Sequence, residues 1–133
     1  GQLERAITYF QGMIVLGVAP DTKSYNCMIV VYTRLNQWQQ AMQIFFEMEK
    51  ANVARDVYTY NSAMHACERA GQWEVTIDLI NHMYSSSVLP DTITYNTAIN
   101  AYGKAGMWQK CLQLLNILRG KAYATAVSTQ HSG

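Results

Sequence analysis

Three kinds of polar residue recur along the chain at a constant interval of 35 residues. Within each unit an aspartate precedes an asparagine by five residues, and a cation follows the asparagine by eight. An amide offers donors and acceptors to the polar edge of a base, and a cation can contact phosphate. The pattern indicates a repeated polar binding surface. The three sets are Asn26, Asn61 and Asn96; Asp21, Asp56 and Asp91; and Arg34, Arg69 and Lys104.

The remaining reactive residue types do not form a catalytic or metal-binding pattern. Cys27, Cys67 and Cys111 are 40 and 44 residues apart, without a CxxC pair or a Cys/His spacing typical of zinc sites. The HxE…CxxC signature of zinc deaminases is absent. His65 has no partner at the same interval, and no Ser/His/Asp set is in plausible contact. We therefore expect no enzymatic activity, no metal and no cofactor, and we expect the thiols to be buried and reduced.

The composition is that of a folded domain. Half of the 133 residues are hydrophobic and 14% are charged, which argues against disorder. The formal net charge is +1, so nucleic-acid binding would depend on charges placed locally. Apolar runs are far shorter than the ~18 residues that span a bilayer, so we expect no membrane insertion. No targeting segment is visible in the sequence.

Each unit is predicted to contain two helices. In the first, apolar residues follow the i, i+3, i+4, i+7 spacing of a single helical face. Asn36, Gly71 and Gly106 tolerate left-handed backbone and are predicted to end this helix. Trp38, Trp73 and Trp108 open the second helix, and we expect them to be buried wedges. The first apolar face is formed in unit one by Tyr25, Met28, Ile29 and Tyr32.

An isolated helix pair cannot bury both of its apolar faces, so adjacent pairs should stack into an all-α solenoid. We predict seven helices. Residues 1–20 form the second helix of a truncated unit, and the three units are 21–55, 56–90 and 91–121. Residues 122–133 lose the pattern and are expected to be an irregular tail. Arg55 stands where Pro20 and Pro90 close other units, which predicts a looser junction.

Three motifs resemble the pentatricopeptide repeat (PPR) family. They are Thr94-Tyr95-Asn96-Thr97-Ala98-Ile99, Lys104-Ala105-Gly106 and Leu89-Pro90-Asp91. The resemblance covers about residues 1–121, as a half unit and three units. The tetratricopeptide alternative has a 34-residue period with a Trp/Gly/Tyr pattern early in its first helix. In this chain the tryptophans open the second helix instead.

The resemblance implies a right-handed superhelix that binds single-stranded RNA on its concave face, in mitochondria or chloroplasts. In the family, two residues per repeat select one base. They correspond to Asn26 with Asp56 and to Asn61 with Asp91, a combination that prefers uridine and then cytidine. The partner of Asn96 falls at Ala126, which departs from the family pattern.

The residues themselves place the same side chains on one helix face, away from the apolar face. Lys23, Tyr58 and Ile93 lie one turn before the asparagines, where a side chain could cover the face of a base. Part of the pattern also has a structural explanation, which for the aspartates is compatible with a binding role. Aspartate stabilises a helix N-terminus, a cation suits the last turn of a helix, and asparagine can be a cap or an exposed polar residue.

Two functions therefore remain open. One is sequence-specific RNA binding in organelle RNA processing, stability, editing or translation, with one base per repeat and a uridine or pyrimidine preference. The other is a structural solenoid that contacts proteins in a large organellar ribonucleoprotein assembly such as a ribosome. The Asn/Asp pairs favour RNA, whereas the modest charge favours the scaffold.

Overall fold

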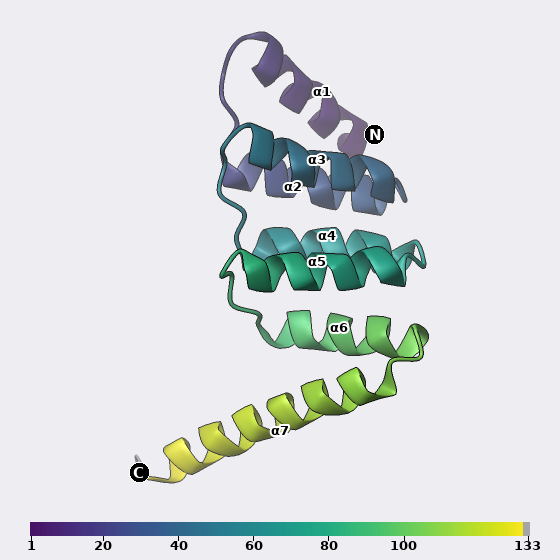
Figure 1. Ribbon diagram of the computed structural model, residues 1–133. Helices are drawn as coiled ribbons and strands as arrows, with labels where there is room; N and C mark the ends of the chain where they lie inside the picture. Colours follow the sequence, from purple (N-terminus) through teal and green to yellow (C-terminus); the bar gives the residue numbers. More distant parts are fainter. Residues whose placement is uncertain (132–133) are drawn as a thin grey trace.

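A computed structural model describes the backbone of residues 1–131 and the side chains of residues 1–120. The described part contains seven α-helices and no strand, as the sequence predicts. The helices are stacked in chain order (Figure 1). They are α1 Gln2–Val15, α2 Thr22–Arg34, α3 Trp38–Lys50, α4 Val57–Arg69, α5 Trp73–Ser85, α6 Thr92–Lys104 and α7 Trp108–His131.

The first helix of each pair begins at an aspartate. Asp21, Asp56 and Asp91 are the N-caps of α2, α4 and α6, and each carboxylate accepts a hydrogen bond from the backbone N–H three residues later. The same helices end two residues before a position with left-handed backbone. Asn36, Gly71 and Gly106 have φ of 58°, 73° and 76°, as the spacing predicts. The resulting turns are short, so the two helices of a pair pack against each other.

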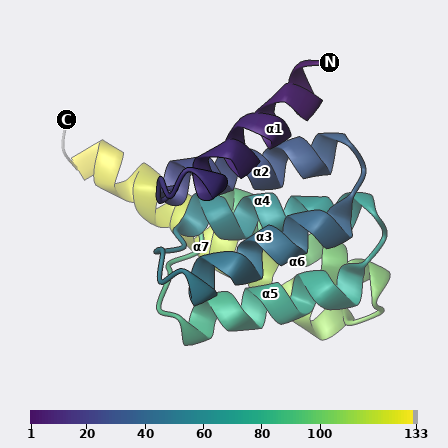
Figure 2. The same cartoon turned by 90° about the horizontal axis from the view of Figure 1, so that it is seen from above.

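The first helices form a continuous row. α2 packs against α4, and α4 packs against α6. α3 and α5 each pack against the first helix of their own pair and also against the next first helix, so that α3 contacts α2 and α4 while α5 contacts α4 and α6. Figure 2 looks along this stack and shows the helices from above. The row α2–α4–α6 therefore forms one surface of an α-helical solenoid.

The core is centred on the aromatic residues between α3, α4 and α5. Tyr60 and Phe45 are fully buried, and their rings meet edge to face with centroids 5.2 Å apart. The Tyr60 hydroxyl lies 2.8 Å from His82 Nδ1 and donates to Ser86 Oγ at 3.2 Å. Tyr60 thus joins α4 to α5 through both apolar and polar contacts.

The expectation that the tryptophans are buried wedges is wrong for two of them. Trp73 is 38% exposed and Trp108 is 67% exposed, while Trp38 is partly buried. These residues stand at the first position of the second helix, at the end of the apolar face rather than in its middle. The wedge position is occupied by the tyrosine of the first helix instead.

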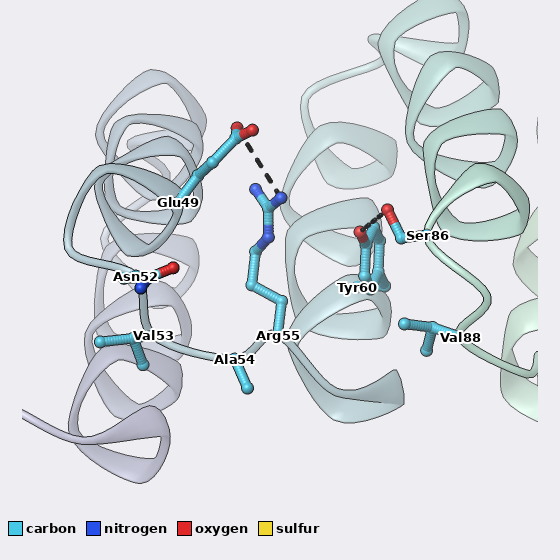
Figure 3. Close-up of a pocket in the computed structure, with 8 residues that line it drawn as sticks. All are labelled: Glu49, Asn52, Val53, Ala54, Arg55, Tyr60, Ser86 and Val88. Atoms are coloured by element: carbon cyan, nitrogen blue, oxygen red, sulfur yellow. Dashed lines mark hydrogen bonds and ion pairs between the residues drawn. The ribbon is translucent and has the colours of Figure 1, made fainter.

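The expected looser junction at Arg55 is also not observed. The Arg55 guanidinium lies over the Phe45 ring, 4.4 Å from its centroid, and donates to the Phe45 carbonyl at 3.3 Å. It also pairs with Glu49 at 3.7 Å, at the edge of a hollow of about 390 Å³ (Figure 3). A cation held by three groups thus replaces the proline that closes other units.

Helix α7 differs from the expected irregular tail. Its backbone is helical up to His131, well beyond residue 121. Residues 121–131 contain no proline that would end the helix. Within the described residues, none of the helices combines the length and apolarity needed to cross a membrane.

Candidate nucleic-acid interface

A groove of about 440 Å³ lies on the row of first helices, between α2, α4 and α6. It gathers six of the residues that the sequence singles out. Tyr58 and Ile93 are both more than half exposed and lie one turn before Asn61 and Asn96 on their helices. The six residues are Arg34, Tyr58, Asn61, Arg69, Asp91 and Ile93.

The Asn61/Asp91 pair is directly hydrogen-bonded inside this groove. Asn61 Nδ2 donates to Asp91 Oδ1 at 3.0 Å, although the two residues belong to successive units. Thr94 Oγ1 donates to Asn61 Oδ1 at 2.6 Å, and it also lies 2.9 Å from Asp91 Oδ1. After these contacts the amide retains one N–H donor and one acceptor lone pair.

The Asn26/Asp56 pair has the same connections but is less accessible. Asn26 Nδ2 donates to Asp56 Oδ1 at 3.4 Å, and Thr59 Oγ1 donates to Asn26 Oδ1 at 2.7 Å. Asn26 is 5% exposed, whereas Asn61 is partly exposed. Lys23, one turn earlier, is exposed but does not line the groove. The two pairs therefore differ in how a ligand could reach them.

Asn96 is exposed on α6, and the Ala126 side chain that corresponds to its partner lies outside the described side chains. Asn100, one turn further along α6, donates through Nδ2 to Glu68 Oε1 at 3.2 Å. The third unit therefore presents the amide of Asn96 without a described aspartate beside it.

The three predicted phosphate-binding residues lie at the C-terminal ends of the first helices and are all exposed. Arg34 and Arg69 line the groove, and Lys104 lines a separate hollow of about 520 Å³ beside Trp108. Arg69 Nη2 donates to Asn36 Oδ1 at 3.1 Å. A guanidinium carries five N–H donors, so this bond leaves Arg69 able to bind an anion.

The aspartates are held in their charged form. Burial alone raises the pKa of Asp91, but hydrogen bonds from the Thr94 N–H and the Asn61 amide lower it below its ordinary value. The pKa of Asp56 is likewise lowered, because hydrogen bonds from Thr59 and Asn26 exceed the effect of burial. Each pair therefore presents an anionic acceptor beside a neutral amide.

Sequence reasoning missed the threonines. Thr59 and Thr94 are buried and lie three residues after Asp56 and Asp91, in capping boxes. Ser24 occupies the equivalent position after Asp21, so the 35-residue period carried this signal. Sequence reasoning gave His65 little weight, but it lies in the groove on the same helix as Asn61 and Arg69.

Among solved structures, the chain is similar to three helical-repeat proteins. PPR10 in complex with an 18-nt psaJ RNA element has a TM-score of 0.65 and 21% identity, over 85% of this chain and 17% of PPR10. The PPR domain of Arabidopsis thaliana protein-only RNase P 1, in complex with tRNA, has a TM-score of 0.81 and 17% identity, over 100% of this chain and 72% of that domain.

Nuclear proteinaceous RNase P 2 from A. thaliana has a TM-score of 0.78 and 16% identity, over 89% of this chain and 25% of that one. The chain thus spans about a sixth of PPR10 and a quarter of this enzyme. At these identities the likeness describes the fold alone.

The sequence comparisons identify the repeats themselves. No curated protein matches the chain in sequence. A family model described as "PPR repeat family" matches residues 20–69 and 55–101, and a second model, "PPR repeat", matches residues 93–121. These matches together cover more than half of the 133 residues and span helices α2 to α6 and the first part of α7. The chain belongs to the PPR repeat family.

Proposed function

We propose that the chain binds single-stranded RNA along the α2–α4–α6 surface and reads one base per repeat. The observation that carries the proposal is the groove in which Asn61 and Asp91 lie with Tyr58, Ile93 and two arginines. A hydrogen-bonding amide, exposed apolar and aromatic side chains and nearby cations are the groups that recognise an unpaired base and its phosphate. The chain acts as a binding module without a catalytic step.

Uridine is the base that we assign to the Asn61/Asp91 pair. The amide retains one donor and one acceptor, and the carboxylate beside it is a further acceptor. An ionised carboxylate favours a base edge that presents an N–H, which uracil has at N3 and guanine at N1. Among the bases the family resemblance selects uridine, with cytidine second, and extends this choice to Asn26/Asp56.

The similar structures support RNA as the ligand, because PPR10 and the PPR domain of protein-only RNase P 1 were each crystallised in complex with RNA. We further propose, as the family resemblance implies, that the protein acts in a mitochondrion or chloroplast in the processing, stability, editing or translation of a transcript. A fluorescent fusion of the complete gene product would test this location.

The test of RNA binding is a base-selectivity measurement on the chain and on two variants. We expect fluorescence anisotropy at low salt to give tighter binding to oligo-uridine than to oligo-adenosine. Asn61→Ala should reduce this preference by about 1–3 kcal/mol. Asn81→Ala is the matched control, because Asn81 is exposed on α5, away from the groove, and should leave the preference unchanged.

A protein-scaffold role would give a different result. If the unmodified chain binds neither RNA, or binds both equally, the base-reading proposal is wrong and the scaffold alternative gains. Phe46 and Trp73 on the second helices are partly exposed and would be available to a protein partner in that case.

A further inference from the structure

Two buried threonine hydroxyls contact the proposed base-reading amides. Thr59 Oγ1 lies 2.7 Å from Asn26 Oδ1, and Thr94 Oγ1 lies 2.6 Å from Asn61 Oδ1. The structure assigns to Thr59 and Thr94 the role of positioning residues, which hold the amide of the preceding repeat in one orientation and thereby set its base specificity. This inference rests on the proposed function and extends it to residues outside the Asn/Asp pair.

The hydrogen bonds around the Thr94 hydroxyl indicate which acceptor receives its proton. The hydroxyl accepts from the Asp91 backbone N–H at 3.2 Å and has a single proton to donate. The two acceptors within reach are Asn61 Oδ1 at 2.6 Å and Asp91 Oδ1 at 2.9 Å. Asp91 Oδ1 already receives the Thr94 N–H and the Asn61 amide. The shorter bond to Asn61 is therefore the one that the proton should favour.

Together the threonine and the aspartate distinguish the two ends of the amide. The hydroxyl faces Oδ1 of Asn61, and the carboxylate faces Nδ2. A rotation of the amide by 180° would place its oxygen against the carboxylate and its NH₂ against the hydroxyl, which exchanges the donor and the acceptor offered to a base. Because Thr94 is almost fully buried, water is poorly placed to replace its hydroxyl.

The same arrangement recurs in the other pair. Thr59 Oγ1 accepts from the Asp56 N–H at 3.1 Å and lies 2.8 Å from Asp56 Oδ1, in addition to its contact with Asn26. A capping box requires the bonds between threonine and aspartate, but it does not require the bond to an asparagine 33 residues away. The asparagine contact thus adds a function to a local helix-capping motif.

The test replaces Thr94 in the whole chain. Thr94→Val removes the hydroxyl with little change in shape, and Thr94→Ser restores it. Thr97→Val is the control, since Thr97 is a buried threonine on the same helix whose hydroxyl donates to the Ile93 carbonyl and not to an asparagine. All four proteins are compared for thermal unfolding, for the Asn61 side-chain NH₂ signals in NMR, and for their affinity ratio between oligo-uridine and oligo-adenosine.

We expect Thr94→Val to shift or broaden the Asn61 NH₂ signals and to lower the affinity ratio by about 3- to 10-fold, the equivalent of one hydrogen bond. Thr94→Ser should regain most of the ratio, and Thr97→Val should retain all of it. If folded Thr94→Val keeps the full ratio and unshifted NH₂ signals, the positioning role is wrong while RNA reading stands. If the unmodified chain shows no preference, the proposed function fails and the inference fails with it.

Discussion

At the scale of single residues, the aspartates combine two roles, helix capping and pairing with an asparagine of the preceding repeat. Asp91 Oδ1 caps α6 by accepting the Thr94 N–H, and the same oxygen accepts the amide of Asn61 from the preceding repeat. The helix cap therefore fixes the carboxylate at the place where the amide needs it. Capping and pairing with Asn61 depend on the same geometry.

The shared role predicts a pH-dependent effect of Asp91→Ala. The folded-state pKa of Asp91 lies below its ordinary value of 3.8, so the carboxylate's contribution is complete above that value and is lost as the pH falls through the folded-state pKa. At neutral pH the substitution should lower the free energy of unfolding by about 1–2 kcal/mol, as loss of an N-cap does.

Urea titrations at several pH values would check this. The difference between the two proteins should narrow once the pH is below 3.8. Asp78→Ala is the control at an exposed position within α5 and should have a small effect. An Asp91→Ala effect of the same size at neutral and at strongly acidic pH would contradict this account.

Sequence reasoning could locate the asparagines and aspartates because their period is visible without knowledge of side-chain contacts. It could not show that Asn26 is buried while Asn61 is partly exposed, because that difference depends on how neighbouring helices pack. It also missed Thr59 and Thr94, whose bonds to asparagines span 33 residues. A local capping pattern gives no indication of such a contact.

At the scale of helices, the sequence predicts the left-handed residue in the turn within each pair better than the one in the connection between pairs. Asn36 and Gly71 are residue types that tolerate a positive φ, and both adopt one. The second helices end in the same way, at Gly17, Asn52 and Ser87, with φ of 77°, 60° and 59°. The positive φ of Ser87 could not be predicted from its residue type, because serine rarely adopts this conformation.

Ser87→Gly should therefore stabilise the fold. Left-handed backbone costs a residue with a Cβ atom about 1–2 kcal/mol, part of which is offset by the greater freedom of glycine in the unfolded chain. We expect a gain of about 0.5–1 kcal/mol in the free energy of unfolding, measured by denaturant titration.

Ser85→Gly is the matched control. Ser85 is the last residue of α5, so glycine there should be neutral or destabilising. Equal effects of the two substitutions would mean that the backbone at Ser87 is not strained.

The tryptophans show where a repeat pattern misleads. Their strict 35-residue spacing predicted three buried wedges, yet Trp108 is mostly exposed and Tyr60 is fully buried. Periodicity establishes that residues occupy equivalent positions, but burial depends on the neighbour that each position meets. The helix order and the fold class were predictable because they follow from the period and the apolar spacing, and the family was predictable because three short motifs carry the resemblance.

At the scale of the whole molecule, the small net charge makes the arrangement of cations decisive. The formal charge is +1, but Arg34, Arg69 and Lys104 all lie at the same end of the row α2–α4–α6. Arg5, Lys50 and Lys110 lie on α1, α3 and α7 instead. RNA that follows the row of first helices would meet the first set of cations and not the second.

This placement predicts a specific salt dependence. If each cation of the first set neutralises one phosphate, the logarithm of the RNA association constant should fall with the logarithm of salt concentration with a slope of about −2, from ~0.7 per phosphate of a single strand. Replacing all three by glutamine should bring the slope close to zero, and replacing Arg5, Lys50 and Lys110 should leave it nearly unchanged. Both variants lose three positive charges, so a non-specific effect of net charge would flatten both slopes equally. If only the replacement of Arg5, Lys50 and Lys110 flattened the salt-dependence slope, the phosphates would lie along the second helices, away from the Asn61/Asp91 groove.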